Sequence, residues 1–229
     1  MEWFYGWGPA IAMGALMTLE VAVTSAVLGV LLGLVATLAS FSRMGALRWL
    51  VDVYSNIMRG IPQLVLILLA YYGSTVALTR LAELLGSGGN PVEIPPLAAG
   101  IFALALIVGG YTYPIFRGAI QAIPKGQIEA AKAFGLTPWQ VFSLISWPQL
   151  LRYALPGLGN VWISTLKDTS LIAVIGLEEL TRTSMLATSD TRRALFFYLT
   201  AGGIYLAMTL ISGLILARLE KRAARGARR

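Results

Sequence analysis

Residues 129–148, EAAKAFGLTPWQVFSLISWP, form a polar insert between long apolar segments. In its first part Ile128, Ala131 and Phe134 recur at helical spacing, which predicts a short amphipathic helix with these three residues on one face. Gly135 is expected to end that helix, because glycine adopts the left-handed conformation without a steric penalty. The chain is therefore expected to turn at this point.

A second helix is predicted to begin at Thr137. Proline suits the first helical position, which Pro138 occupies, and Gln140 stands three residues after Thr137, as a capping box requires. Pro148 is expected to end this helix. The insert is thus predicted to be a rigid two-helix element, within a loop of about residues 121–150, that projects into an aqueous compartment.

Outside the insert, the composition is typical of an all-α membrane protein. Of 229 residues, 57% are hydrophobic and 13% are charged, against about 25% charged in an average soluble domain. The absence of cysteine and histidine excludes disulfides, thiolate chemistry and a Ser-His-Asp triad, and no metal site is expected. The net charge of +7 is divided between loops and a basic tail, a distribution that disfavours nucleic-acid binding.

Five apolar runs are predicted to cross the membrane as a single domain of residues 1–229. They lie at about residues 11–41, 61–78, 97–120, 153–175 and 194–219. Gly29, Gly33 and Ala36 give the first run a face suited to close helix contact. A short amphipathic helix is expected within residues 42–60, and an exposed loop at GSGGNP, residues 86–91. The first ten residues lack a basic segment, so the first span is expected to stay in the protein.

The basic residues predict the orientation of these spans. With five spans the termini lie on opposite sides, and thirteen lysines and arginines fall on the side of the C-terminus against four on the other. The N-terminus is therefore expected outside, with the C-terminus and the insert in the cytoplasm. No G-x-x-x-x-G-K-[ST] phosphate loop is present, so the chain is not expected to be an ATP-hydrolysing enzyme itself.

The insert also resembles a family signature. Permease subunits of type I ATP-binding-cassette importers carry a cytoplasmic loop with the pattern E-A-A, then glycine, then I-x-L-P. The matching residues here, with Trp147 in place of the leucine, are Glu129, Ala130, Ala131, Gly135, Ile145 and Pro148. YSNIMRGIPQLVLILLAYYG (residues 54–73) and LKDTSL (residues 166–171) are similar to further family runs. The chain looks most similar to the polar amino acid subfamily, and within it to the Q-type permeases of histidine/lysine/arginine/ornithine systems.

This resemblance implies a function and a set of partners. The chain would be a permease subunit in a bacterial inner membrane that imports polar, in particular basic, amino acids into the cytoplasm. It would work with two ATP-binding subunits, an extracytoplasmic solute-binding protein and a second permease, with a paralogous heterodimer favoured over a homodimer. The chain itself would hold no cofactor, since ATP and magnesium would bind the partner subunits. The six matching residues would couple the spans to the ATPases; from spacing alone, Glu129 is simply a solvated residue paired with Lys132.

Polar residues within the spans are candidates for the substrate pathway, because buried polar groups in a bilayer are costly. The set is Tyr72, Tyr111, Asn160, Ser164, Lys167 and Asp168. Alternative interpretations stay open: tyrosines anchor and pack spans, Asn160 can bond between helices, and Lys167 with Asp168 fits a packing or gating role better than substrate selection. In a different class of function, an autonomous ion-coupled secondary amino acid transporter, the same charged pair would form the ion site.

One residue departs from the family pattern. Pro114, in YTYPIFRG, stands where many relatives carry an acidic residue, ahead of the Arg117-Gly118 pair. The loss of that carboxylate weakens the inference that the cargo is cationic. Proline at this position also removes a backbone hydrogen bond from the span.

Overall fold

Helices make up the regular structure in the part of the chain that the computed structural model describes, residues 3–85 and 93–224. The elements in order are η1 (Trp3–Gly6), α1 (Gly8–Ser40), α2 (Gly45–Gly60), α3 (Gln63–Leu84), α4 (Pro96–Gln121), α5 (Lys125–Ala133), α6 (Pro138–Val141), η2 (Phe142–Ser146), α7 (Trp147–Asp168), η3 (Thr169–Ile175), α8 (Leu180–Thr191) and α9 (Ala194–Ala224). The predicted loop at residues 86–91, the first two residues and the basic residues at 225, 228 and 229 lie outside the described residues.

Four of these helices, α1, α3, α4 and α9, are long and apolar enough to cross a membrane. The helix in the fourth predicted span, α7, is not among them. Its sequence includes polar and charged residues, among them Arg152, Asn160, Lys167 and Asp168, which lower its hydropathy. The all-helical membrane architecture is therefore confirmed, while the fifth crossing and the orientation of the termini stay predictions.

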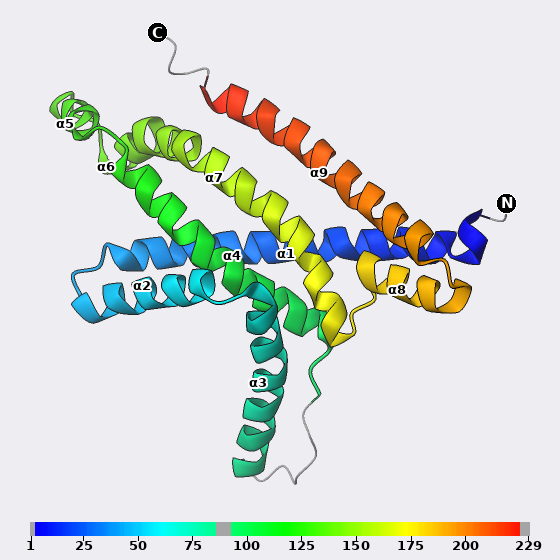
Figure 1. Cartoon of the computed structure of the whole chain (residues 1–229). Coiled ribbons are helices and arrows are strands. Elements are labelled where there is room, and N and C mark those ends of the chain that lie inside the picture. The colour runs from blue at the N-terminus through cyan, green and yellow to red at the C-terminus, as the bar shows by residue number, and fades with distance from the viewer. Residues whose placement is uncertain (1–2, 86–92, 225–229) are drawn as a thin grey trace.

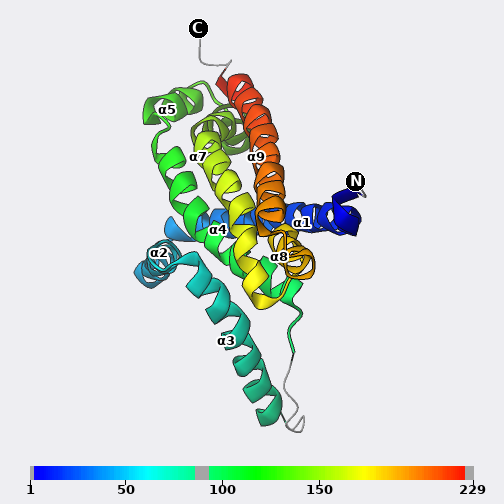
Figure 2. The same ribbon diagram turned by 45° about the vertical axis from the view of Figure 1, so that its right-hand side comes forward.

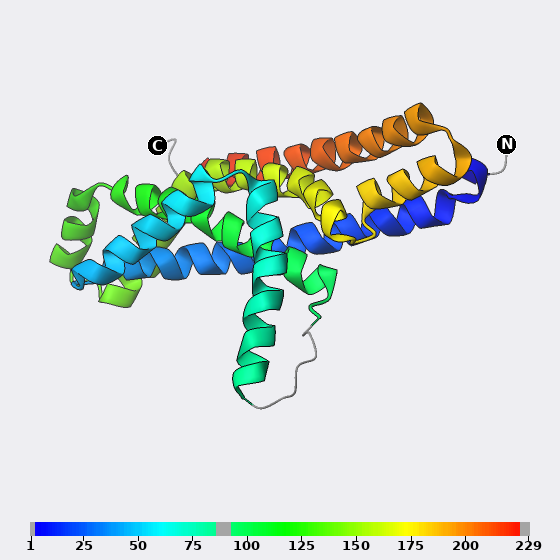
Figure 3. The same cartoon turned by 60° about the horizontal axis from the view of Figure 1, so that its bottom comes forward.

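Different helices lie at the two ends of the molecule (Figure 1). Helices α4, α7 and α9 run side by side, and α1 crosses them (Figure 2). Helices α5 and α6 lie at the same end as the C-terminus, whereas α8 and the N-terminus lie at the other end. Helix α3 points away from the rest of the molecule (Figure 3). The predicted insert is thus a projecting element at one end of the helical layer that α4, α7 and α9 form.

The contact between α1 and α4 depends on small residues. A Cβ added to Gly29 would lie 2.4 Å from the Val108 side chain, and one added to Gly33 would lie 2.0 Å from Thr112 Oγ1. The Thr112 hydroxyl donates a hydrogen bond to the Gly29 carbonyl at 3.3 Å across this contact. The predicted small-residue face of the first span is confirmed.

Helix α2 is the amphipathic helix expected within residues 42–60, and it is attached to α4 by hydrogen bonds. Tyr54 Oη donates to the Leu106 carbonyl at 2.6 Å, and burial raises the pKa of the Tyr54 phenol to about 12. Ser55 Oγ donates to the Gly110 carbonyl at 2.7 Å. Pro114 lies inside α4 four residues after Gly110 and has no N–H for that carbonyl. Ser55 therefore supplies the hydrogen bond that the proline removes.

We expect Ser55→Ala to destabilise the chain by about 1–3 kcal/mol, because it leaves a buried carbonyl without a partner. Pro114→Ala restores a backbone N–H, so the same serine substitution is expected to cost much less in that background. Thermal unfolding of the four variants in detergent measures this double-mutant cycle. An equal cost of Ser55→Ala in both backgrounds would show that Ser55 does not compensate for the proline.

Candidate functional site

The insert folds locally much as its sequence predicts. Helix α5 is followed by Gly135, whose φ of +81° lies in the left-handed region. At the start of α6, Thr137 N–H donates to Gln140 Oε1 at 2.8 Å, and Gln140 N–H donates to Thr137 Oγ1 at 3.4 Å. The glycine turn and the capping box are therefore confirmed.

Two details of the prediction are wrong. Pro148 does not end the second helix, because α6 continues through the π-helical segment η2 into α7, and Pro148 lies in the first turn of α7. The helix passes through Pro148 because the preceding turn, η2, is π-helical, and such a local distortion accommodates a proline that the sequence alone suggests would end the helix. Phe134 lines the same hollow as Ala131 but is not buried with it, since 85% of its surface is exposed.

The candidate coupling residues surround a hollow beside the loop. Ala130, Ala131, Ile145 and Pro148 line this space of about 960 Å³, together with residues such as Arg152. Glu129 and Gly135 lie outside its lining. Glu129 is exposed and, among the described residues, forms no ion pair with Lys132, so its carboxylate is accessible to a partner.

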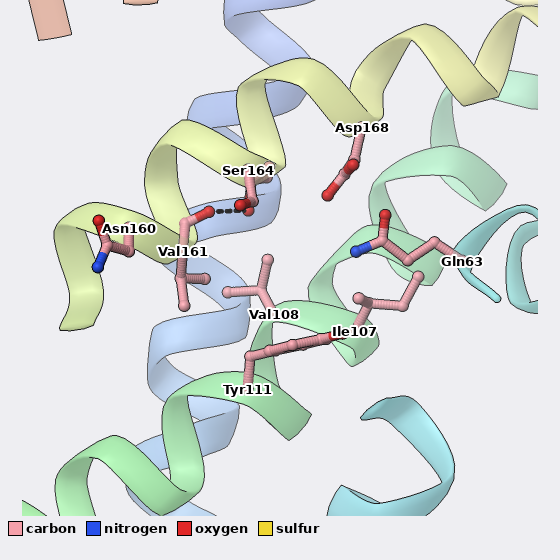
Figure 4. Close-up of a pocket in the computed structure, with 9 residues that line it drawn as sticks. Gln63, Ile107, Val108, Tyr111, Asn160, Val161, Ser164 and Asp168 are labelled. Atoms are coloured by element: carbon pink, nitrogen blue, oxygen red, sulfur yellow. Dashed lines mark hydrogen bonds between the residues drawn. The ribbon is translucent and has the colours of Figure 1, made fainter. Parts of the chain in front are cut away.

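Four of the six candidate pathway residues meet in one cavity between α3, α4 and α7 (Figure 4). Tyr111 contributes from α4, and Asn160, Ser164 and Asp168 from α7, to a space of about 220 Å³. Their spacing on α7 places Asn160, Ser164 and Asp168 on one helix face, since residues four apart are neighbours. The cavity has an apolar floor, formed by Ile107, Val108 and Val161.

Two polar residues that line the cavity are not among the candidates predicted from the sequence. Gln63, at the start of α3, directs its amide toward the Asp168 carboxylate (Figure 4). Thr165 lines the cavity and donates its hydroxyl to the Val161 carbonyl at 2.8 Å. Both residues are polar, which is the signal that the sequence offers for a cavity-lining role. Gln63 reaches the cavity only because α3 packs against η3 and α4.

The other two candidates lie elsewhere. Tyr72 is 58% exposed on α3 and packs edge to face against Tyr71, with ring centroids 5.0 Å apart. Lys167 is exposed and does not line the cavity, although it is adjacent to Asp168. Of the adjacent charged pair, only Asp168 lines this cavity.

At the opposite end of the molecule from the insert, a fully buried carboxylate joins three helices. Glu179 accepts hydrogen bonds from the backbone N–H groups of Thr181 and Arg182 at 2.9 and 2.8 Å, which caps α8. It also accepts from Tyr205 Oη on α9 at 2.8 Å and from Thr18 Oγ1 on α1 at 3.4 Å. The polar segment between the last two predicted spans is therefore the packed helix α8.

At the end of α4 nearer the insert, Arg117 is paired with an acidic residue from another helix. Its guanidinium donates to Asp52 Oδ1 at 3.1 Å, and the Tyr113 hydroxyl donates to the same oxygen at 2.6 Å. Asp52 belongs to α2. Arg117 thus has a carboxylate partner even though Pro114 replaces the acidic residue of the family pattern.

These features define a helical membrane transport protein: apolar helices long enough to span a bilayer, a cavity between helices that carries several polar side chains, and a projecting polar loop. Residues 25–225 match the model of the family described as "Binding-protein-dependent transport system inner membrane component". The chain belongs to this family. Membership favours binding-protein-dependent transport over the ion-coupled alternative.

Full-length relatives are similar across nearly the entire chain. The histidine/lysine/arginine/ornithine transport system permease protein HisQ of Escherichia coli (strain K12) is 42% identical over 225 residues, 98% of each chain. The nopaline transport system permease protein NocQ of Agrobacterium fabrum is 41% identical over 97% of this chain and 94% of its own length. The arginine ABC transporter permease protein ArtQ of Haemophilus influenzae is 40% identical over 92% of both.

Solved structures agree with the fold. A chain from the crystal structure of an amino acid ABC transporter with histidines superposes with a TM-score of 0.79 at 33% identity, covering 94% of this chain and 95% of that one. An inward-facing MetNI methionine ABC transporter gives a TM-score of 0.71 at 19% identity, over 94% and 96% of the two chains. The second likeness shows the fold alone.

Proposed function

We propose that the chain is the permease subunit of an ATP-driven importer that carries polar, in particular basic, amino acids into the cytoplasm of a bacterium. The observation that carries this proposal is the full-length similarity, at 40% identity or more, to permeases named for histidine, lysine, arginine, ornithine and opine transport. The similarity extends through both the loop and the helices that line the cavity. The class of substrate and the coupling to ATP-binding subunits are therefore inferred from the same relatives.

In this proposal the chain crosses the inner membrane five times, with α7 as the fourth crossing along the chain, the N-terminus outside and the C-terminus in the cytoplasm. The basic residues near the loop and along the end of α9 support this orientation. Two ATP-binding subunits, a solute-binding protein outside and a second permease complete the assembly, with a paralogous permease favoured. ATP and magnesium bind the partner subunits.

The loop transmits the motion of the ATP-binding subunits to the spans. Its rigidity supports this role: α5 is joined to α6 by a glycine turn and a capping box, and α6 continues without a break into α7. Movement of α5 would therefore be passed directly along α7 to the cavity-lining residues Asn160, Ser164 and Asp168. Rigid-body rocking of the helices between inward-open and outward-open states follows.

The cavity between α3, α4 and α7 is the proposed substrate pathway. Asp168 supplies a carboxylate for an ammonium or guanidinium group, since charge-assisted hydrogen bonds are stronger than neutral ones. The hydroxyl and amide groups of Tyr111, Asn160 and Gln63 supply neutral donors and acceptors. This set fits a cationic amino acid even without an acidic residue at position 114.

We expect Asp168→Asn to raise the KM for uptake of a basic amino acid by about tenfold or more, because an ion-paired hydrogen bond worth about 1.5–3 kcal/mol is replaced by a neutral one. Tyr72→Phe is the matched control, since Tyr72 lies outside the cavity and should leave KM unchanged. Uptake is measured with the complete importer in liposomes, alongside its ATPase rate. Unchanged transport kinetics in Asp168→Asn would remove Asp168 from the pathway.

A further inference from the structure

An exposed row of aromatic side chains lies along the helix that follows the glycine turn. Trp139, Phe142 and Trp147 form this aromatic row, with ring centroids 5.7 Å apart for the first pair and 5.9 Å for the second. Trp139 is 72% exposed, and the other two rings are each about two-fifths exposed. Of the three, only Trp147 belongs to the matched signature, where it replaces a leucine, and none lines the hollow of the coupling residues.

The π-helical segment aligns this row. Trp147 N–H donates to the carbonyl of Phe142, five residues earlier, as in a π-helix. In a regular α-helix, residues five apart point to different sides, because successive residues turn by about 100°. The wider π turn brings Phe142 and Trp147 onto one side, where their rings meet. The local distortion thus builds a continuous aromatic surface.

The aromatic row and the coupling residues occupy different sides of the same helix. Trp139, Phe142 and Trp147 line a surface hollow of about 430 Å³ with Ser143. Leu144 and Ile145 line the separate hollow that faces α5, and the two hollows share no residue. A partner seated against α5 would therefore not fill the hollow of the aromatic row.

The aromatic row continues into the apolar surface of the helical layer. One turn after Trp147, Leu151 is exposed on α7, which we place across the membrane. Tryptophan is enriched where spans meet the membrane surface, because its ring is amphipathic. At the other end of the layer a second exposed aromatic group, Tyr5, Phe196 and Tyr198, lies where α9 begins. The two groups stand at the two ends of the spans, as aromatic belts do.

We propose that the aromatic row is inserted in the headgroup region of the cytoplasmic leaflet, so that the lipid surface supports the coupling loop from the side opposite α5. The inference rests on the proposed orientation of the chain and, for the ATPase side of the loop, on the proposed ATP-binding subunits, but it does not depend on the substrate. The loop would then be clamped between the membrane and its ATPase partner. A force applied to α5 would tilt α7 about this fixed point rather than bend the loop.

Bromine quenching of tryptophan fluorescence tests the proposal. The full chain, with Trp139 as its only tryptophan and phenylalanine at the other tryptophan positions, is placed in liposomes whose lipids carry bromine near the headgroup or near the chain end. We expect headgroup-proximal bromine to quench Trp139 about twofold more than deep bromine. A chain that retains only Trp162, which lies about 22 Å beyond Trp147 along α7, is expected to show a different depth preference from that of Trp139.

A matched control places the reporter on the other side of the loop. Phe134→Trp, in a chain without other tryptophans, puts an exposed ring on the α5 side and is expected to escape quenching at either depth. Adding the ATP-binding subunits should change the fluorescence of this reporter and leave the lipid quenching of Trp139 in place. Absence of lipid quenching at Trp139, or its loss when the ATP-binding subunits bind, would overturn the proposal.

Discussion

Gly135→Val is expected to reduce ATP-driven uptake on the order of tenfold or more, because a β-branched residue held at positive φ costs about 1–3 kcal/mol. The cost arises within the local backbone and not from neighbouring side chains, since nothing else lies within 4 Å of a Cβ added at this position. Relief of the strain would change the angle between α5 and α6. The force from the ATP-binding subunits would then no longer be delivered along α7.

Gly135→Asn is the matched control for this prediction. Asparagine is one of the few residues that enter the left-handed region readily, so this variant should retain most of its uptake. Uptake by cells that contain equal amounts of each variant in the membrane compares them directly. If valine and asparagine behaved alike, the left-handed turn would have no part in coupling.

Gly33→Leu is expected to prevent α1 from packing against α4. A Cβ at this position would lie 2.0 Å from Thr112 Oγ1 and 3.1 Å from the backbone nitrogen of Tyr113, so a rotamer change of Thr112 does not make enough room. Overpacking in a tight core costs about 1–3 kcal/mol or more, and the leucine here would separate two helices along their main contact. We expect a large drop in the yield of monodisperse protein and in its unfolding temperature.

The same substitution at Gly213 separates this effect from the general effect of a larger side chain in an apolar helix. A Cβ added to Gly213 on α9 has nothing within 4 Å. Size-exclusion profiles and thermal unfolding in detergent should place Gly213→Leu near the wild type. Wild-type behaviour of Gly33→Leu would mean that α1 and α4 do not approach each other as closely as the structure has them.

Local chemistry made several elements predictable from the sequence. The turn at Gly135 and the cap at Thr137 depend on residues within four positions of each other, and both were found. The small-residue face of α1 was predictable because only glycine allows such an approach. The α2 helix was predictable from its amphipathic sequence.

Features that depend on tertiary packing are harder to predict from the sequence. In apolar helices the hydrophobic pattern does not show which side faces a cavity. The sequence therefore does not distinguish Asp168, which lines the cavity, from Tyr72, which does not, and it does not indicate Gln63. The buried Glu179 lies in a segment of mixed polarity whose packing between α1 and α9 has no local signature. The sequence does not show that the helix continues through Pro148, because the π-helical turn before the proline has no sequence signature.

The most direct test of ATP coupling through residues 129–148 uses liposomes that contain this chain, its second permease and the ATP-binding subunits. Uptake of a labelled basic amino acid and ATP hydrolysis are measured together, with the solute-binding protein outside. We expect the wild type to accumulate the amino acid only with ATP, and Glu129→Arg combined with Gly135→Val to abolish accumulation although the chain remains folded. Wild-type accumulation by this double variant, or accumulation by the permeases under an ion gradient without the ATP-binding subunits, would contradict this coupling.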